Sequence, residues 1–319
     1  MITARGLTRT FRPPGRQATR GPITAVQGVD LDVRAGELVG FLGPNGAGKT
    51  TTLRMLATLL TPTAGRATVA GHDLRTDPTG VRRRIGYVGQ GNGAGLDQRV
   101  GEELELQARL HGLPAATARR RATDLLDRYD LADTATRTVV TLSGGQKRRL
   151  DLALGLLHQP DLIFLDEPSA GLDPQSRGNL WDHVRDLRAE HGATVFLTTH
   201  YLDEADALCD RVLVIDHGRI VAEGSPDELK SKVAGDQITV TSTDPTRTAA
   251  IATNLPDTTE LTVTADTVGF RVPRGDTALP ILLRELDAAG VAVGAVRTHR
   301  PTLDDVFLTV TGRSLRDAN

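Results

Sequence analysis

Short apolar runs alternate with helical patterns over the first 230 or so residues. The run Glu37–Leu42 has the length and composition of a buried strand, and leucines then recur at helical spacing between Lys49 and Leu60. Leu162–Leu165 and Thr194–Thr198 are two further apolar runs of strand length, and residues 102–158 are predicted to be mainly helical. This alternation of strand and helix patterns predicts an α/β domain.

Two local patterns mark the end of this domain. Residues Arg211–Glu223 alternate between apolar and polar positions and predict a hairpin that turns near His217 and Gly218. Ser225 then offers an N-cap, Pro226 a first helical position and Glu228 an acid at the third. We expect a helix to begin there and to close a first domain that spans residues 1–234.

The composition changes from Gly235 onward, where threonine and valine dominate and glycine becomes rarer. The spacing of apolar residues in 235–319 alternates between strand and helix patterns. It predicts a β-α-β-β-α-β order, which is the ferredoxin-like α+β arrangement. The predicted strands are 237–242, 259–264, 267–272 and 291–298, and the predicted helices are 245–254 and 276–289. We expect this second, smaller domain to carry no catalytic constellation, and we expect Asp304 and Asp305 to lie at a helix N-terminus.

Composition and charge exclude several classes of protein. With 39% apolar residues, 24% charged residues and a net charge of −2, the chain is typical of a globular protein, and it lacks the basic surplus of a nucleic-acid binder. Cys209 is the single cysteine, so no intramolecular disulfide can form, and we expect it to be a buried core residue. The apolar runs are shorter than the roughly 20 residues of a membrane-spanning helix, and the N-terminus lacks the apolar stretch of a signal peptide. The chain is therefore expected to stay in the cytoplasm, with any membrane role supplied by a partner.

A glycine-rich segment carries the strongest chemical signal. GPNGAGKT fits the P-loop pattern GxxxxGK[ST] and lies between a predicted strand and a predicted helix. Glycines allow backbone N–H groups to point at phosphates, and a helix N-terminus attracts negative charge. Lys49 is expected to reach the β- and γ-phosphates of ATP, and the Thr50 hydroxyl to ligate Mg²⁺. A chance glycine turn is the alternative, which the strand–loop–helix context disfavours. The predicted ATP contacts are Gly43, Pro44, Asn45, Gly46, Ala47, Gly48, Lys49, Thr50 and Thr51.

Two adjacent carboxylates follow the apolar run LIFL. Asp166 suits a magnesium ion held through water, and Glu167 is then placed to act as general base on the attacking water. A strand that ends in a charged turn is the simpler alternative, but the presence of a P-loop upstream favours the catalytic interpretation.

The segment LSGGQ, residues 142–146, has both a structural and a functional interpretation. Ser143 and Gln146 form the Ser-x-x-Gln pattern of a capping box, so a helix is expected to start at Ser143. A helix N-terminus with two glycines, Gly144 and Gly145, and a hydroxyl is also a second anion site. One chain with two phosphate-binding helix ends indicates a head-to-tail dimer, in which each P-loop faces the partner's Ser143 across one ATP.

The order of a P-loop, LSGGQ, an Asp-Glu strand and a lone histidine resembles the ATP-binding cassette (ABC) ATPases. The resemblance implies a P-loop NTPase fold with a helical subdomain at about residues 91–158. It also implies that Gln90, in GYVGQ, links Mg²⁺ and water to the membrane partner, that Asp173 belongs to the D-loop, and that His200 contacts the γ-phosphate. Phe11 is then the expected aromatic residue that stacks on adenine, although residues 12–22, an expected exposed loop, lengthen its distance from the P-loop. An ordinary core phenylalanine is the alternative.

The chain is similar over nearly its whole length to the ATPase subunits of daunorubicin/doxorubicin-resistance exporters, through residues 142–178, HYLDEADALCDRVLVIDHGRIVAEGSPDEL and PTLDDVFLTVTGR. This resemblance implies a peripheral protein at the cytoplasmic face of the membrane. It also implies a separate ABC-2-type permease as partner, a second copy in an ATP-sandwich dimer, and export of a hydrophobic drug or lipid. Residues 89–95 (GQGNGAG) are unusually rich in glycine and depart from the family pattern near the expected permease contact. An ABC ATPase that acts on nucleic acid or the ribosome, and an importer motor with a ligand-binding C-terminal domain, are the two rival interpretations.

Overall fold

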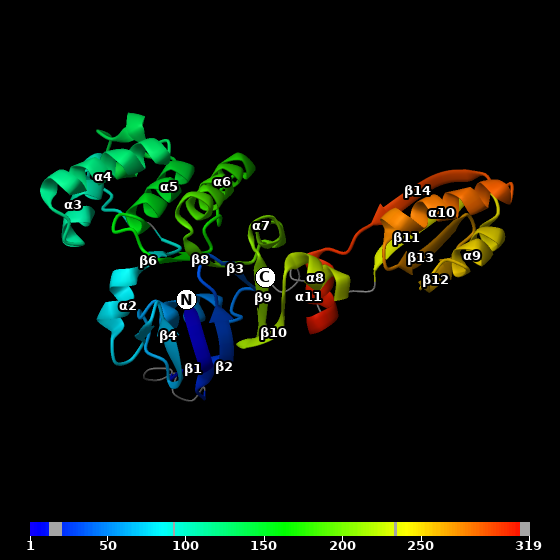
Figure 1. Cartoon of the computed structure of the whole chain (residues 1–319), viewed down its shortest axis with the longest axis horizontal. Helices are drawn as coiled ribbons and strands as arrows, with labels where there is room; N and C mark the ends of the chain where they lie inside the picture. Colours follow the sequence, from blue (N-terminus) through cyan, green and yellow to red (C-terminus); the bar gives the residue numbers. More distant parts are fainter. Residues whose placement is uncertain (13–20, 92, 233–234, 313–319) are drawn as a thin grey trace. The chain divides into compact units, whose positions relative to one another are not determined.

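The computed structural model describes residues 1–12, 21–91, 93–232 and 235–312. It divides into two compact units, Met1–Glu223 and a second unit from Gly224 onward, and each forms its own layered structure (Figure 1). Most of the loop expected at 12–22 lies outside the described residues. The helix α8 (Pro226–Lys232), expected to close the first domain, belongs to the second unit because it packs against α11 (Leu303–Thr311).

A six-stranded sheet forms the centre of the first unit, with the strand order β10-β9-β3-β8-β7-β6. The pairings of β9 with β3, β3 with β8, β8 with β7 and β7 with β6 are all parallel. Three fully buried phenylalanines lie on three neighbouring strands of this sheet. The Phe196 ring centroid lies 5.6 Å from that of Phe41 and 5.9 Å from that of Phe164. The strands of this sheet are β3 Leu38–Leu42, β6 Ile85–Val88, β7 Leu162–Asp166, β8 Thr194–Thr199, β9 Arg211–Asp216 and β10 Arg219–Gly224.

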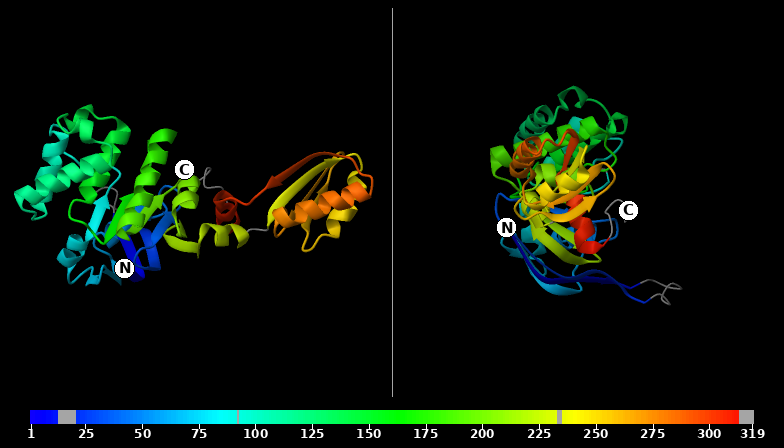
Figure 2. Two further views of the ribbon diagram at one scale, coloured as in Figure 1. Left: turned by 45° about the horizontal axis from the view of Figure 1, so that its top comes forward. Right: turned by 90° about the vertical axis from the view of Figure 1, so that its right-hand side faces the viewer.

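An antiparallel sheet of the order β2-β1-β4-β5 packs into the same core. The long hairpin of β1 and β2 extends from the body of the unit (Figure 2). The strands are β1 Ile2–Phe11, β2 Ile23–Val33, β4 Ala64–Val69 and β5 His72–Asp73.

Helices complete the first unit. The helices α3, α4 and α5 gather into one helical part (Figure 1), as expected for the helical subdomain. The bounds are α1 Lys49–Leu56, α2 Pro78–Arg84, α3 Val100–Leu110, α4 Ala115–Arg128, α5 Gly144–Gly155, α6 Pro174–His191 and α7 Leu202–Leu208, with 3-10 turns at Ala132–Thr134 and Val139–Thr141. Among the described residues, no helix combines the length and the apolar character needed to cross a membrane.

The helix after the P-loop is shorter than its leucine spacing predicts. It was expected to run from Lys49 to Leu60, but α1 ends at Leu56. Thr58 adopts a left-handed backbone with φ of 62°, and the Leu60 amide donates to the Arg54 carbonyl oxygen. The chain therefore turns back over the end of the helix, a geometry that helical periodicity does not encode.

The second unit has the predicted β-α-β-β-α-β order. Its sheet runs β12-β13-β11-β14 with antiparallel pairings throughout, and α9 and α10 pack on one face around Phe270 and Leu282, as Figure 1 shows. This confirms the ferredoxin-like arrangement. The elements are β11 Asp236–Ser242, α9 Pro245–Thr253, β12 Thr259–Val263, β13 Thr267–Val272, α10 Gly275–Ala288 and β14 Val293–His299.

Candidate active site

Four neighbouring parallel strands bring the predicted residues to one edge of the central sheet. The P-loop follows β3, His200 follows β8, Glu167 follows β7 and Gln90 lies just beyond β6. In the sheet these strands stand in the order β3-β8-β7-β6. Because parallel strands end on the same side, the groups converge at the carboxyl edge, where open α/β sheets bind ligands.

At two glycines of the P-loop, the backbone packs too closely against neighbouring strands for a side chain to fit. Gly48 has φ of 108° and caps the N-terminus of α1, and a Cβ on it would lie 2.5 Å from the Ala25 carbonyl oxygen. A Cβ on Gly43 would lie 2.3 Å from the Ile215 carbonyl oxygen. Both positions therefore require glycine, and they hold the loop against β2 and β9 while α1 presents its N-terminus.

Lys49 lies inside this loop with only 3% of its surface exposed. Its ammonium donates to the carbonyl oxygens of Gly43 at 2.7 Å and Pro44 at 3.1 Å, and lies 3.2 Å from Glu167 Oε1. Burial lowers the pKa of Lys49, and the neighbouring Glu167 carboxylate opposes that shift. The lysine is thus held at the phosphate-binding end of the loop by three oxygen atoms.

Three side chains that can offer oxygen ligands to a metal ion lie beside the lysine and are joined by hydrogen bonds. The Thr50 hydroxyl donates to Asp166 Oδ1 at 2.9 Å, and Gln90 Nε2 donates to Thr50 Oγ1 at 3.2 Å. These are the three residues predicted to ligate magnesium, and a hydroxyl, a carboxylate and an amide are the groups that this hard cation prefers. Rotation of the Gln90 amide by half a turn would place its oxygen, in place of Nε2, beside the Thr50 hydroxyl. The set of ligand atoms therefore fits Mg²⁺.

Glu167 occupies a strained backbone conformation with φ of 47°. Two hydrogen bonds hold it there, because the Glu167 amide donates to the Thr198 carbonyl oxygen at 3.1 Å and to Thr198 Oγ1 at 3.0 Å. The Thr198 hydroxyl in turn donates to Asp166 Oδ1 at 2.7 Å. Thr198 therefore positions both carboxylates.

His200 Nδ1 lies 3.4 Å from Glu167 Oε2. The distance is that of an ion pair, and this buried nitrogen has no hydrogen-bond partner in the described structure. The contact with His200, followed by the charge of Lys49, lowers the pKa of Glu167 against the opposing effect of its burial. The carboxylate is therefore kept ionised, which its predicted role as a general base requires.

The helix α5 begins at the LSGGQ segment with the predicted capping box. The Gln146 amide donates to Ser143 Oγ at 3.2 Å, and the Ser143 amide donates to Gln146 Oε1 at 3.0 Å. Ser143 and Gly144 are exposed. A Cβ on Gly145 would lie 2.8 Å from Ser176 Oγ, so this glycine lets the tip of α5 pack closely against the start of α6.

Several predicted residues lie outside this cluster of contacts. Asp173 caps α6, with Oδ1 accepting from the Ser176 amide at 2.9 Å. Phe11 is 38% exposed near the end of β1, and the Arg9 guanidinium lies 4.7 Å from its ring centroid. Within the described residues, the side-chain hydrogen bonds of Ser143 and Asp173 stay within their own helix ends and do not reach Lys49 or Glu167.

Sequence reasoning missed three residues of the site. Thr198 holds both carboxylates, Tyr87 OH lies 3.5 Å from Asp166 Oδ2, and Arg148 binds the Asp166 carbonyl oxygen at 3.2 Å. Thr198 stands two residues before His200 in the run TVFLTTH, and that position was the one signal in the sequence that could have indicated it.

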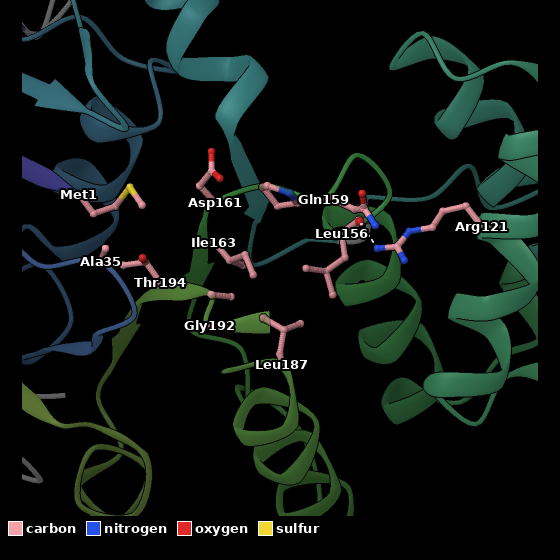
Figure 3. Close-up of a pocket in the computed structure, with 12 residues that line it drawn as sticks. Met1, Ala35, Arg121, Leu156, Gln159, Asp161, Ile163, Leu187, Gly192 and Thr194 are labelled. Atoms are coloured by element: carbon pink, nitrogen blue, oxygen red, sulfur yellow. Dashed lines mark hydrogen bonds between the residues drawn. The ribbon is translucent and has the colours of Figure 1, made fainter. Parts of the chain in front are cut away.

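A cavity of about 410 Å³ lies away from this chemistry (Figure 3). Its lining includes Asp161, Ile163 and Thr194, at the amino ends of β7 and β8. Those residues stand at the sheet edge opposite the one that carries Glu167 and His200. A second groove, of about 340 Å³, runs beside the Gln90 segment and includes Gly89, Gly91 and Gly93 in its lining.

The fold and the motif residues define an ATP-hydrolysing P-loop cassette, and comparisons with known proteins agree. Residues 26–170 match the ABC transporter family, and residues 224–311 match the C-terminal domain of the DrrA1-3-like ATP-binding proteins. The chain is 48% identical over 306 residues to the daunorubicin resistance ATP-binding protein DrrA3 of Streptomyces coeruleorubidus, covering 95% of this chain and 96% of the relative. It is 40% identical over 314 residues to the Nod factor export ATP-binding protein I of Ralstonia nicotianae, covering 98% and 97%.

A solved structure shows the same fold. The dimeric ATP-binding cassette MJ0796, in a post-hydrolysis state bound to ADP and Pi, superposes with a TM-score of 0.64 at 26% identity, covering 70% of this chain and 98% of that one. The chain belongs to the ATP-binding subunits of ABC transporters, within the group that has the DrrA-like C-terminal domain.

Proposed function

We propose that two copies of this chain bind two ATP molecules between them, head to tail, and that hydrolysis drives export of a hydrophobic drug or lipid through a separate ABC-2-type permease. The observation that carries the proposal is the convergence of Lys49, Thr50 and Glu167 at one sheet edge, while the capped tip of α5 exposes Ser143 and Gly144. One chain thus offers both halves of a phosphate clamp, and no hydrogen bond between described residues joins Ser143 or Gly144 to Lys49, Thr50 or Glu167 in the same copy.

Each residue then has a defined task. The P-loop backbone and Lys49 bind the β- and γ-phosphates, and Thr50, Gln90 and Asp166 would hold Mg²⁺, which neutralises charge on the phosphates. Glu167 accepts a proton from the water that attacks the γ-phosphorus, as the bond to the β-phosphate oxygen breaks. His200, beside Glu167, contacts the γ-phosphate.

The remaining predicted contacts complete the ATP site. Phe11 stacks on adenine with the ring face that Arg9 does not cover. Ser143, Gly144, Gly145 and Gln146 of the second copy bind the γ-phosphate, and Asp173 lies across the same interface.

Trapping the closed dimer tests the clamp. Glu167→Gln removes the base while keeping the shape of the side chain, so turnover should fall by about 10²–10⁴-fold and Mg·ATP should accumulate between two copies. Light scattering should then report a dimer with ATP and a monomer with ADP. A monomer at saturating Mg·ATP, or unimpaired hydrolysis in this variant, would falsify the proposal.

We infer that the permease docks in the groove beside the Gln90 segment, as a peripheral assembly at the cytoplasmic face of the membrane. The groove is lined by apolar, glycine, histidine and charged residues that include Leu59, His111 and Arg82, and Leu59 is 56% exposed. A Leu59→Cys variant should cross-link to a membrane protein with several spanning helices, whereas Arg66→Cys, exposed on β4, should not. Cross-linking from Arg66→Cys alone would contradict this docking site. Cys209 is buried and should not compete.

We assign the second unit to dimerisation or permease docking. It carries a ferredoxin-like sheet, and α8 packs against α11 within the unit. Removal of the whole unit from Gly224 should leave the ATP site of the first unit formed and impair assembly or export. Normal assembly and export by the shortened chain would contradict this assignment.

A further inference from the structure

A buried arginine joins three parts of the active site. Arg148 lies on α5, in the turn after the LSGGQ segment, and is 7% exposed. Its Nε donates to the Pro168 carbonyl oxygen at 2.7 Å, Nη1 to the Gly89 carbonyl oxygen at 2.6 Å, and Nη2 to the Asp166 carbonyl oxygen at 3.2 Å. A guanidinium has five N–H donors in a fixed fork, so it can hold several carbonyl groups at once.

Two of these carbonyl groups flank the general base. Asp166 and Pro168 are the neighbours of Glu167, whose left-handed backbone requires external support. The third carbonyl group, that of Gly89, precedes Gln90. One side chain of α5 therefore contacts the segments that carry Glu167 and Gln90.

Asp151 supplies a second anchor one helical turn further along α5. It is also 7% exposed, its Oδ1 accepts from the Gly93 amide at 2.8 Å, and its Oδ2 lies 3.9 Å from Arg148 Nη1. Arg148 and Asp151 thus bind Gly89 and Gly93, on either side of Gln90. Glycine-rich backbone has little conformational preference of its own, so these anchors set the position of Gln90.

We propose that Arg148 couples the two ATP sites of the dimer. The tip of α5 would bind the ATP of the second copy, while Arg148 on the same helix supports Glu167 and Gln90 of its own copy. A shift of α5 on binding that ATP would then move the carbonyl groups around its own Glu167. Arg148 acts here as a positioning residue, and the proposal rests on the head-to-tail dimer proposed above.

Steady-state hydrolysis over a range of ATP concentrations tests the coupling. Arg148→Gln should lower kcat by roughly 10–100-fold, because misplacing reacting groups by about 1 Å can cost 10²-fold. It should also bring the Hill coefficient for ATP down toward one, while the ATP affinity of the single copy stays unchanged. Arg148→Lys should rescue part of the effect, since a lysine keeps the charge but cannot hold three carbonyl groups.

A matched control comes from the next residue. Arg149→Gln removes the same charge from the same helix, at a side chain about 100° further round it, and should leave kcat and the Hill coefficient unchanged. Thermal unfolding shows whether each variant is folded. If Arg148→Gln does not fold, Arg148→Lys carries the test, and wild-type kcat and Hill coefficient in that variant overturn the proposal.

The dimer itself is tested separately. If Glu167→Gln forms the ATP-dependent dimer, and a folded Arg148 variant hydrolyses ATP with wild-type cooperativity, the coupling role is wrong and the proposed function stands. If Glu167→Gln stays monomeric, the proposed function fails first. A loss of ATP affinity equal to the loss of kcat in Arg148→Gln would also overturn the coupling role, because it would indicate a defect in the ATP pocket of the single copy.

Discussion

The Lys49 ammonium lies 3.2 Å from Glu167 Oε1 and links the P-loop to the proposed general base. The contact joins β3 to β7 across the carboxyl edge of the sheet, with His200 on the other oxygen of the same carboxylate. The contact with His200, followed by the charge of Lys49, stabilises the ionised form of Glu167 and lowers its pKa. The same geometry makes the lysine and the proposed base interdependent.

Replacing the P-loop lysine should weaken ATP binding. Lys49→Ala removes a buried ammonium, and charge-assisted hydrogen bonds contribute about 1.5–3 kcal/mol each, so the Kd for ATP should rise by at least about 10-fold. Calorimetric titration with Mg·ATP measures the change. Lys230→Ala, which removes the same charge from α8 in the second unit, should leave the Kd unchanged. Wild-type affinity in Lys49→Ala would contradict the phosphate contact.

The aromatic ring near the end of β1 should contribute to ATP affinity. Stacking of a base on an aromatic side chain contributes about 1–3 kcal/mol, so Phe11→Ala should raise the Kd for ATP by roughly 5–150-fold. Phe11→Tyr keeps the ring and should bind ATP almost as tightly as the wild-type chain. Equal affinities in all three proteins would remove Phe11 from the adenine site.

Comparing alanine variants at two helix caps can separate the structural role of Ser143 from its proposed role in ATP binding. Ser143 caps α5 and Ser225 caps α8: each hydroxyl accepts from the backbone amide three residues later, and each serine amide donates to the side chain of that residue. Replacing either serine by alanine should lower the unfolding free energy by about 1 kcal/mol. Only Ser143→Ala should also reduce ATP turnover and formation of the ATP-bound dimer. If turnover in Ser143→Ala is as high as in Ser225→Ala, the serine is a cap alone.

Glu204 should make stability depend on pH. This glutamate on α7 is fully buried; Trp181 Nε1 donates to its Oε1 at 3.2 Å, and its Oε2 has no hydrogen-bond partner in the described structure. Burial, foremost, raises the pKa of Glu204 above the ordinary 4.5. The folded state binds the Glu204 proton more tightly than the unfolded state does. The contribution of the protonated Glu204 to the free energy of unfolding is therefore complete below pH 4.5, and it is lost as pH rises through the pKa of the folded state.

Denaturant unfolding between pH 4 and pH 8 measures this dependence. Glu204→Gln removes the titrating group and keeps an oxygen for Trp181, so it should flatten the pH dependence and be at least as stable as the wild-type chain at pH 8. Asp133→Asn, at an exposed aspartate, should retain the wild-type profile. An unchanged slope in Glu204→Gln would show that the carboxylate does not titrate in this range.

Local sequence determined the chemistry and much of the secondary structure of this protein. The P-loop glycines, the Asp166-Glu167 pair and the capping boxes at Ser143 and Ser225 are patterns of a few consecutive residues, and their geometry follows from backbone conformation and hydrogen bonds at short range. The alternation of strands and helices was likewise sufficient for the ferredoxin-like order of the second unit.

Only the tertiary structure decided which of these groups meet. Thr50 and Asp166 are 116 positions apart, and their hydrogen bond exists because the sheet places β3, β8 and β7 side by side. The support of Glu167 by Thr198, and the burial of Arg148 against three carbonyl groups, depend on the same strand order. Local periodicity fixes which face of an element is apolar, whereas the order of strands is set by packing across the whole core, so these contacts could not be derived from spacing along the chain.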